Sequence, residues 1–211
     1  MLQPTSPQAC AFSCRAVKTA LPLAQLRSPP LYSKAALMDL IRQLALQLGD
    51  FTLASGKKSK YYLDCRKVTL DSAGANLIAD GMLEQLDANL PDAVGGMAIG
   101  ADPITAAVIT IAGRSGKKLK GFIVRKEAKQ HGTGRDVEGP VKPGETAVIV
   151  EDVVTTGGSS LAAIEKAEAF GLKVRGVLAI IDRLEGGRET LAARGYDLQT
   201  LLTIRDFGLE P

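Results

Sequence analysis

The feature that most constrains the fold is a regular alternation, after residue 92, of short apolar segments with segments of helical periodicity. Two of the latter, residues 102–112 and 156–170, predict helices. The apolar segments predict buried strands and cover residues 93–99, 119–125, 146–150, 173–181 and 198–203. Continuous apolar strands that alternate with helices are typical of a parallel sheet covered on both faces. The sequence therefore predicts an α/β fold with a central parallel sheet flanked by helices.

A different pattern precedes these strands. Residues 34–48 carry apolar side chains at helical spacing, with Ser33 as the expected N-cap and Gly49 as the expected residue after the helix. Two strand-like runs around a Ser-Gly turn predict a β-hairpin with strands at residues 51–53 and 61–63. An apolar stripe that starts at an aspartate cap then predicts a second helix at residues 71–90.

The first 33 residues have a composition of their own. They contain five prolines and three basic residues, and the first acidic residue of the chain is Asp39. A basic, serine-containing and acid-free segment is typical of a transit peptide, or of a disordered tail, or of residues added by an upstream start codon. We therefore treat residues 1–33 as a disordered or targeting-like extension and residues 34–211 as one domain.

The composition excludes several classes of protein. No stretch approaches the roughly 20 apolar residues that a membrane span needs. The three cysteines, an odd number without paired metal-ligand spacing, argue against a disulfide framework and for a cytoplasmic setting. The net charge of +3 is too small to indicate nucleic acid, although basic residues crowd the stretch 114–135. Such a local patch suits a small polyanion, and its plainer interpretation is a solvated charged loop.

Residues 148–159 form the most informative motif of the chain. A β-branched run brings the chain to the carboxyl edge of the sheet, where open α/β folds bind ligands, and Glu151 and Asp152 follow. The loop 155–159 contains only small residues, whose N–H and hydroxyl groups can surround a phosphate at the start of the next helix. The two carboxylates would repel a bare phosphate but can accept hydrogen bonds from ribose hydroxyls. The motif therefore predicts a ribose 5-phosphate site, and the alternative is an ordinary strand–turn–helix corner.

This motif resembles the signature with which type I phosphoribosyltransferases bind phosphoribosyl pyrophosphate (PRPP). Neither a nucleotide P-loop nor a Rossmann glycine pattern occurs in the chain. The resemblance implies a core with a five-stranded parallel sheet, roughly residues 71–208, under a smaller hood of roughly residues 34–70. It also implies a catalytic role for Asp152. The implied PRPP contacts in this motif are Glu151, Asp152, Val153, Val154, Thr155, Thr156, Gly157, Gly158 and Ser159.

Residues 125–132, Arg-Lys-Glu-Ala-Lys-Gln-His-Gly, are similar to a loop of the orotate phosphoribosyltransferases. In that family the loop closes over PRPP from across a dimer interface, which implies a homodimer that shares the loop at 126–136. Lys129 is the candidate for stabilising the leaving group. His131, the only histidine of the chain, is implied to contact the pyrophosphate, and the alternative is a purely structural role. The residues implied to contact the pyrophosphate are Arg125, Lys126, Lys129 and His131.

Two further segments resemble the base pocket of that family. Tyr61 and Tyr62 offer a flat apolar wall to a pyrimidine, or they simply alternate across their strand. Arg183, which follows the strand predicted at 173–181, is implied to hold the carboxylate of orotate, with a surface ion pair to a neighbouring acid as the alternative. Thr155 matches a position that orotate and PRPP share. The implied orotate-binding residues are therefore Thr155 and Arg183.

The resemblance covers roughly residues 34–208, and two positions depart from the commoner bacterial pattern. Ala54 stands where the hairpin often has a lysine, and Ile99-Gly100 stands where a Tyr-Lys pair often follows the first core strand. Two cationic contacts to PRPP are therefore in question. Backbone groups of Gly100 and Ala101 could replace one of them.

The reaction that the resemblance implies is Mg²⁺-dependent transfer of ribose 5-phosphate from PRPP to orotate, giving orotidine 5′-phosphate and pyrophosphate in pyrimidine biosynthesis. The metal is expected on substrate oxygens, with no direct protein ligand. The expected partners are orotate, PRPP and a second copy of the chain, in the cytoplasm, without nucleic acid or membrane. The alternatives are a type I transferase for another base and a non-catalytic PRPP-sensing regulator.

Overall fold

The computed structural model describes residues 32–52, 58–127 and 136–211, and the centre of this part is a six-stranded sheet. The strand order is β5-β4-β3-β6-β7-β8. Five strands run parallel, whereas the short β5 pairs antiparallel with β4 at the edge. The predicted parallel sheet is confirmed, with β5 as an addition. The bounds are β3 Ala93–Met97, β4 Lys120–Val124, β5 Val137–Glu138, β6 Thr146–Val154, β7 Lys173–Asp182 and β8 Asp197–Thr203.

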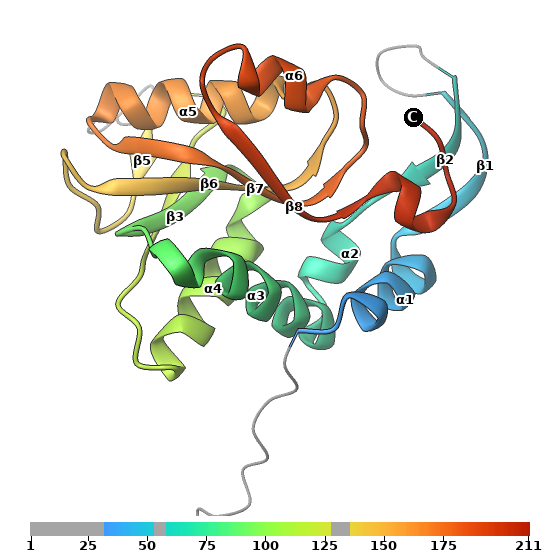
Figure 1. The fold of residues 1–211 in the computed structure, drawn as a ribbon, viewed down its shortest axis with the longest axis horizontal. Helices are drawn as coiled ribbons and strands as arrows, with labels where there is room; N and C mark the ends of the chain where they lie inside the picture. The colour runs from blue at the N-terminus through green and yellow to red at the C-terminus, as the bar shows by residue number, and fades with distance from the viewer. Residues whose placement is uncertain (1–31, 53–57, 128–135) are drawn as a thin grey trace, which may run out of the picture.

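Helices cover both faces of this sheet (Figure 1). Two of them lie on each face, and their bounds are α3 Ser72–Leu86 with α4 Ala101–Arg114, and α5 Gly158–Phe170 with α6 Gly187–Ala192. Alternate residues of β6 join different cores: Val148 and Val150 pack with α3 and α4, whereas Ala147 and Ile149 pack with α5 and α6. Because both faces are buried, the strands need apolar residues throughout, which explains the continuous apolar runs.

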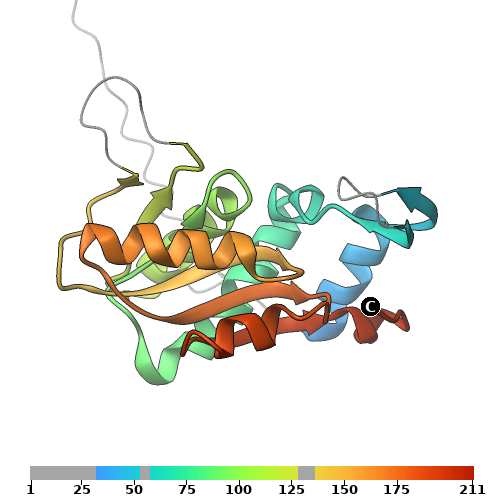
Figure 2. The ribbon, with the colours of Figure 1, turned by 90° about the horizontal axis from the view of Figure 1, so that it is seen from above.

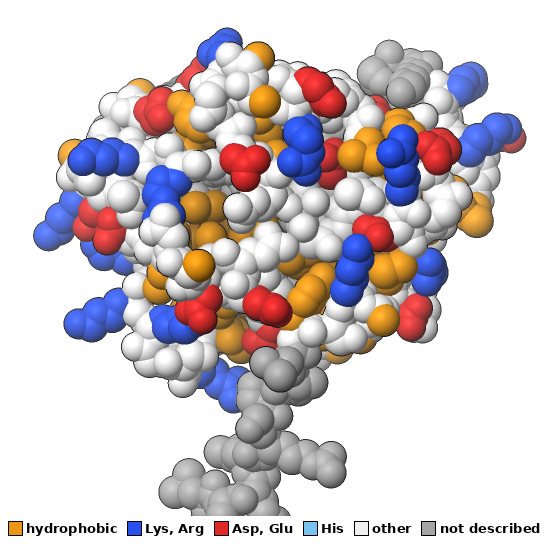
Figure 3. All heavy atoms as spheres, in the orientation of Figure 1, with side chains coloured by type: hydrophobic (Ala, Val, Ile, Leu, Met, Phe, Trp, Pro, Cys, Tyr) orange, Lys and Arg blue, Asp and Glu red, His pale blue; other side chains and the backbone are white. Residues whose placement is uncertain are grey.

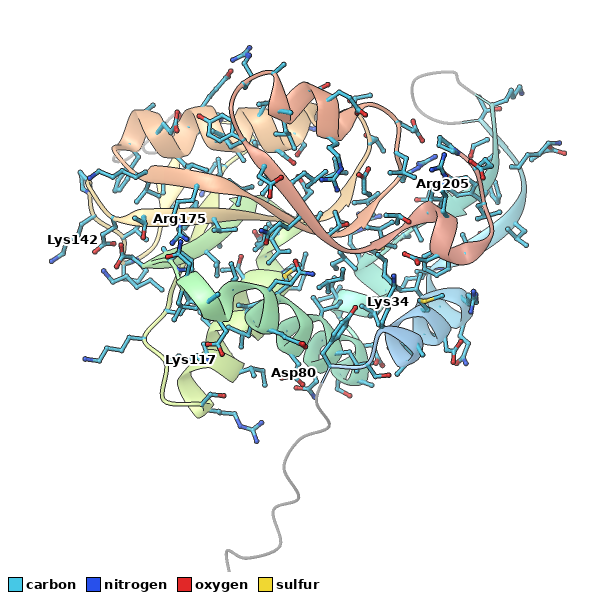
Figure 4. The ribbon with its side chains drawn as sticks, in the orientation of Figure 1. Lys34, Asp80, Lys117, Lys142, Arg175 and Arg205 are labelled. Carbon is cyan, nitrogen blue, oxygen red and sulfur yellow. The ribbon has the colours of Figure 1, made fainter. Side chains whose placement is uncertain are left out.

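The N-terminal elements lie at one end of the sheet (Figure 1, Figure 2). Their bounds are α1 Lys34–Leu44, β1 Leu46–Thr52, β2 Lys58–Leu63 and α2 Arg66–Thr69. Helix α1 is held to the short helix η3 Ile204–Phe207, because Lys34 pairs with Asp206 at 2.8 Å (Figure 4) and Arg42 donates to the Asp206 carbonyl oxygen at 3.2 Å. These elements correspond to the expected hood, whose boundary at residue 70 stays a prediction.

The first helix is shorter than its periodicity predicts. It ends at Leu44, and the next residues join β1, where Leu46 pairs with Leu63. Gly49 therefore lies inside a strand and does not end the helix. The expected N-cap is confirmed, because Ser33 Oγ accepts a hydrogen bond from the N–H three residues on at 3.3 Å.

Other helix boundaries follow the prediction with small shifts. The cap at Asp71 is confirmed by two N–H groups of the first turn that donate to its side chain. Helix α4 begins at Ala101, one residue before the predicted start, and Gly100 precedes its first turn. The sequence does not predict α2, α6 or β5, because four, six and two residues are too few to show a periodicity.

The helices and the surface bear on membrane and nucleic-acid contacts. Within the described ranges, none of the helices is both long and apolar enough to cross a bilayer. On the face shown in Figure 3, basic and acidic side chains are interspersed. The described part of this face therefore lacks the single-sign stripe that would follow a nucleic-acid backbone.

Candidate active site

The strand order reverses between β3 and β6, and such a crossover is where open α/β sheets bind their ligands. The ladder between these two strands reaches Gly95 and Ile149, and β3 ends at Met97. Strand β6 continues to Val154, held on its other side by β7. A cavity of about 270 Å³ opens beyond the end of β3. Its walls are the end of β2 with α2, the segment after β3, and the end of β6 with the start of α5.

Strand β6 is longer than predicted, which places the two acids inside the strand. The sequence predicts an end at residue 150, but pairing with β7 continues and joins Glu151 to Ala179 and Val154 to Asp182. The polar residues do not end the strand, because β7 supplies backbone partners as far as its own last residue. The carboxylates are consequently held by sheet backbone and not by a loop.

The two acids occupy neighbouring positions of β6, and both line the cavity, where their carboxyl groups hydrogen-bond to each other. Glu151 lies toward α5, where Ser160 Oγ donates to its Oε2 at 3.3 Å. Asp152 lies toward the segment after β3, and a Cβ at Gly100 would be only 3.0 Å from Asp152 Oδ1. The glycine that replaces the commoner lysine therefore leaves this carboxylate open to the cavity.

Burial makes it costly to ionise both acids. Glu151 is 5% exposed, and its burial together with the charge of Asp152 raises its pKa to about 7. Burial also raises the pKa of Asp152, although the N–H of Val153, which donates to Oδ1 at 2.9 Å, favours the ionised form. The pair therefore retains a proton, mainly on Glu151, at a pH where ordinary carboxyls are ionised. It offers both a donor and acceptors to hydroxyl groups.

The loop after β6 opens directly into α5. Gly157 has a left-handed backbone with a φ of 82°, and a Cβ there would be 3.1 Å from the carbonyl oxygen of Gly187. Both the backbone and the space therefore favour glycine. Thr156, Gly158 and Ser159 are exposed, so the start of α5 is accessible. Its free N–H groups and the helix dipole can bind an anion.

Tyr61 and Tyr62 alternate across β2, in agreement with the plainer of the two interpretations. Tyr61 is buried, whereas Tyr62 is 38% exposed and lines the cavity. The Tyr62 ring lies 5.8 Å from the ring of Phe51, between centroids. Of the two tyrosines, only Tyr62 can offer a ring face to a ligand in this cavity.

Arg183 contacts Tyr61, and both residues line a neighbouring cavity of about 300 Å³. Its Nε donates to Tyr61 Oη at 3.1 Å, and its guanidinium carbon lies 4.7 Å from the centre of that ring. Arg183 also pairs with Glu185 at 2.8 Å, whereas Asp182 faces Arg188 at 3.6 Å. Arg183 therefore has an acidic partner, as the alternative expected, but the pair is buried and not on the surface. Arg183 does not line the cavity of the two acids.

The expected pyrophosphate-binding residues are described only in part. Arg125 and Lys126 directly follow β4, and Arg125 pairs with Glu138 of β5 at 3.6 Å. Lys126 is exposed. Lys129 and His131 lie outside the described residues, so their placement stays a prediction.

Asp64 and Arg66 line the cavity, although the sequence gives little reason to single them out. Arg66 Nε donates to Asp64 Oδ1 at 2.8 Å and its Nη2 donates to Oδ2 at 3.2 Å, which lowers the pKa of Asp64. The one available signal is an acid and an arginine two residues apart, directly after the hairpin. A guanidinium fixed in this way suits a phosphate. Arg66 adds a cation to a cavity in which Gly100 replaces the commoner lysine. The other such position, Ala54, lies outside the described residues.

The reversal of strand order, the acids inside β6 and the anion-binding start of α5 occur together in one class of protein, the type I phosphoribosyltransferases. Similar proteins narrow this class. The orotate phosphoribosyltransferase of Rhodopirellula baltica is 61% identical over 183 residues, which cover 84% of this chain and 95% of that protein. No protein-family model matches the chain.

Solved structures agree with this relative. Mycobacterium tuberculosis H37Rv orotate phosphoribosyltransferase in complex with Fe(III) dicitrate has a TM-score of 0.75 and 37% identity, covering 83% of this chain and 99% of that one. A structure of the M. tuberculosis enzyme in complex with PRPP has a TM-score of 0.71 and 34% identity, with the same coverage of 83% and 99%. The chain belongs to the orotate phosphoribosyltransferase family.

Proposed function

We propose that this protein transfers ribose 5-phosphate from PRPP to orotate, giving orotidine 5′-phosphate and pyrophosphate in pyrimidine biosynthesis. The observation that carries the proposal is the cavity at the β3/β6 crossover, where Glu151 and Asp152 lie beside the loop that starts α5. The relatives support it, because they are named orotate phosphoribosyltransferases and one was solved with PRPP.

In this proposal PRPP lies along the carboxyl edge of the sheet. Its 5′-phosphate binds at residues 155–159, where N–H groups, hydroxyls and the α5 dipole all favour an anion. Its ribose hydroxyls bind Glu151 and Asp152, which together hold one proton and can therefore both donate and accept. Gly100 keeps the Asp152 side of this contact open.

The chemistry explains why cations gather at the other end of PRPP. The bond from C1′ to the pyrophosphate oxygen breaks as the bond to N1 of orotate forms, and the proton of N1 is released. Negative charge grows on the departing pyrophosphate, so cations there stabilise the transition state more than the ground state. Arg125, Lys126, Lys129 and His131 take this role, with Lys129 at the leaving group. Arg66 adds a fixed guanidinium at the cavity wall.

Orotate is placed against Tyr62, with Thr155 and Arg183 as contacts for its polar groups. Arg183 faces a neighbouring cavity and pairs with Glu185, so the contact requires its guanidinium to turn from that acid toward the substrate. A planar guanidinium matches a carboxylate with two parallel hydrogen bonds. A neutral base has no carboxylate to form these two hydrogen bonds, which favours orotate over uracil and adenine.

In this proposal Mg²⁺ is bound by oxygen atoms of the substrates. Across the described residues, no group of three or more His, Cys, Asp or Glu side chains could hold a metal ion. Mg²⁺ commonly keeps several waters and binds substrate oxygens, so we expect it on the pyrophosphate and the ribose hydroxyls. When bound there, the ion neutralises charge on the leaving group. We assign it no direct protein ligand.

A second copy of the chain completes the proposal. The resemblance of residues 125–132 to the family loop supports a homodimer in which the 126–136 segment reaches across the interface. Lys129 and His131 of one subunit would then serve the cavity of the other. The composition fits a cytoplasmic enzyme, because an odd number of cysteines without paired spacing argues against a disulfide framework.

Product analysis tests the reaction. Purified protein with PRPP, Mg²⁺ and orotate is expected to release one pyrophosphate for each orotidine 5′-phosphate formed, and a chelator is expected to stop both. Binding of PRPP without release of its pyrophosphate in the presence of any of the bases would contradict the proposal and would indicate a PRPP-sensing regulator.

A further inference from the structure

Lys166 of α5 binds the chain where it leaves β4 and where it returns to β5. Its ammonium group donates to the carbonyl oxygens of Arg125 at 2.7 Å and Lys126 at 3.1 Å, and to Asp136 Oδ1 at 3.1 Å. An ammonium group has three N–H donors, so all three are used. The side chain is 27% exposed, which makes these contacts partly shielded from water.

The three acceptors come from the end of β4 and the approach to β5. Arg125 follows β4 directly, and its N–H donates to the carbonyl oxygen of Asp136 at 2.8 Å. The two strands then pair antiparallel, with Val124 opposite Val137. Lys166 therefore closes the junction at which the chain leaves β4 and returns to β5. The backbone of two expected pyrophosphate ligands is anchored there.

The same helix carries the phosphate loop. Helix α5 begins at Gly158, and Lys166 lies eight positions further along, about 12 Å at the rise of an α-helix. One rigid element thus presents the anion-binding start and also holds Arg125 and Lys126. PRPP has a phosphate at one end and a pyrophosphate at the other, so the spacing between these two groups of ligands matters for its binding.

We propose that Lys166 is a positioning residue that sets the spacing between the phosphate loop and the cations Arg125 and Lys126. The inference rests on the proposed function, because it assigns these cations to the pyrophosphate. Its distinguishing consequence is selectivity: loss of Lys166 weakens ligands that reach the pyrophosphate subsite and spares those that occupy only the phosphate loop. A residue that merely supports the fold would affect both kinds of ligand alike.

The test compares Lys166→Met with the wild type by calorimetric binding of PRPP, pyrophosphate and ribose 5-phosphate. We expect the Kd of PRPP and of pyrophosphate to rise about tenfold, in line with the loss of charge-assisted hydrogen bonds, while that of ribose 5-phosphate stays within about twofold. Lys118→Met is the matched control, because Lys118 is exposed and precedes β4 at the opposite end of the sheet. It is expected to change none of the three.

Unchanged binding of PRPP and pyrophosphate in Lys166→Met would overturn the proposal, as would an equal loss for all three ligands. Should that variant fail to fold, Lys166→Arg keeps the charge in a different shape and is expected to show a smaller shift with the same selectivity. Absence of that selectivity would overturn it equally. A wild type that binds these ligands but does not consume orotate would instead refute the proposed function.

Discussion

At the scale of single residues, the unusual feature is a pair of adjacent acids in a buried strand. Glu151 is nearly fully buried beside α5, and the hydroxyl group of Ser160 donates a hydrogen bond to it. Asp152 is more open and faces Gly100. Removing both carboxylates from water disfavours their charged forms, and the two charges also repel each other. The two acids are therefore expected to destabilise the ligand-free protein, and hydrogen bonds from ribose hydroxyls are expected to offset this destabilisation.

Glu151→Gln is expected to stabilise the ligand-free protein at pH 8 but not at pH 5. The pKa of Glu151 is about 7 in the folded protein, above the ordinary 4.5, so the folded state binds more protons between these values. Stability therefore falls as pH rises through this window. Glutamine removes that loss, which is on the order of 3 kcal/mol at pH 8. Urea unfolding at the two pH values measures it.

The control for this variant is Glu165→Gln, which makes the same chemical change on the exposed side of α5. It is expected to show no gain that depends on pH. A Glu151→Gln variant with the same stability difference at both pH values would contradict the buried proton.

Arg183→Gln is expected to raise the KM for orotate at least tenfold, roughly the value of a charge-assisted hydrogen bond, with the KM for PRPP within about twofold. Arg205→Gln is the matched control, since Arg205 is exposed and pairs only loosely with Glu210 at 3.4 Å (Figure 4). Initial rates at saturating co-substrate measure both constants. Equal losses for orotate and PRPP would show that Arg183 supports the fold through Tyr61 and Glu185 instead.

The sequence predicts those site residues whose chemistry is local. Glu151, Asp152 and the small-residue loop are contiguous, so their combination is visible without any fold. Asp64 and Arg66 are not predictable in this way, because they reach the cavity only through the packing of the N-terminal elements against the strand ends. For Arg183 the strand end is predictable, but its partners Tyr61 and Glu185 depend on that packing as well.

At the scale of elements, α5 organises the site. Its start forms the phosphate loop, its first turn supplies Ser160 to Glu151, and its middle supplies Lys166 to the end of β4. The loop depends on a left-handed residue at Gly157, which lies against Gly187 at the start of α6. A change at Gly157 therefore alters the loop and the contact between the two helices.

Gly157→Ala is expected to cost about 1–2 kcal/mol of stability, because a Cβ strains a left-handed backbone. It is also expected to weaken PRPP binding, since the added carbon would be 3.1 Å from Gly187 O and the loop must shift. Gly116→Ala is the control: Gly116 has a similar φ of 74° but open space around it. That variant should lose comparable stability and no PRPP affinity. Equal PRPP affinity in both variants would contradict the role of the loop.

Element boundaries show why sequence patterns fall short. The apolar run predicts that β6 ends at residue 150, yet the strand continues because β7 offers backbone partners to Val154. The periodicity of the first helix extends past Leu44, yet Leu46 pairs across the hairpin. In both cases hydrogen bonds from a distant or later segment decide between two local structures. The order of the longer strands and helices along the chain is predictable, because their apolar patterns follow burial.

At the scale of the whole molecule, the site exists because the sheet leaves a gap at its crossover. Two cores on opposite faces hold the strands, and the N-terminal elements close the gap with Tyr62, Asp64 and Arg66. The cations of the 126–136 loop are expected to come from a second copy. The proposed active site is therefore composite, which makes the assembly part of the chemistry.

Mixing two inactive variants tests this composite site. Lys129→Ala and Asp152→Asn are each expected to lose most turnover, since one removes the leaving-group cation and the other an acid of the ribose site. In a mixed dimer one of the two cavities has both native residues, so equal mixing should restore roughly a quarter of wild-type activity. Activity is measured after the two variants are mixed under conditions that exchange subunits. No recovery in a mixture shown to contain mixed dimers would contradict a shared loop.

The most direct test of the account is the loss of orotate absorbance with purified protein, PRPP and Mg²⁺, with uracil and adenine as parallel bases. We expect that orotate alone is consumed and that its consumption requires both PRPP and the metal. Turnover of uracil or adenine at a comparable rate would contradict the assignment of Arg183 to the base. No turnover with any base, despite PRPP binding, would contradict the proposed reaction itself.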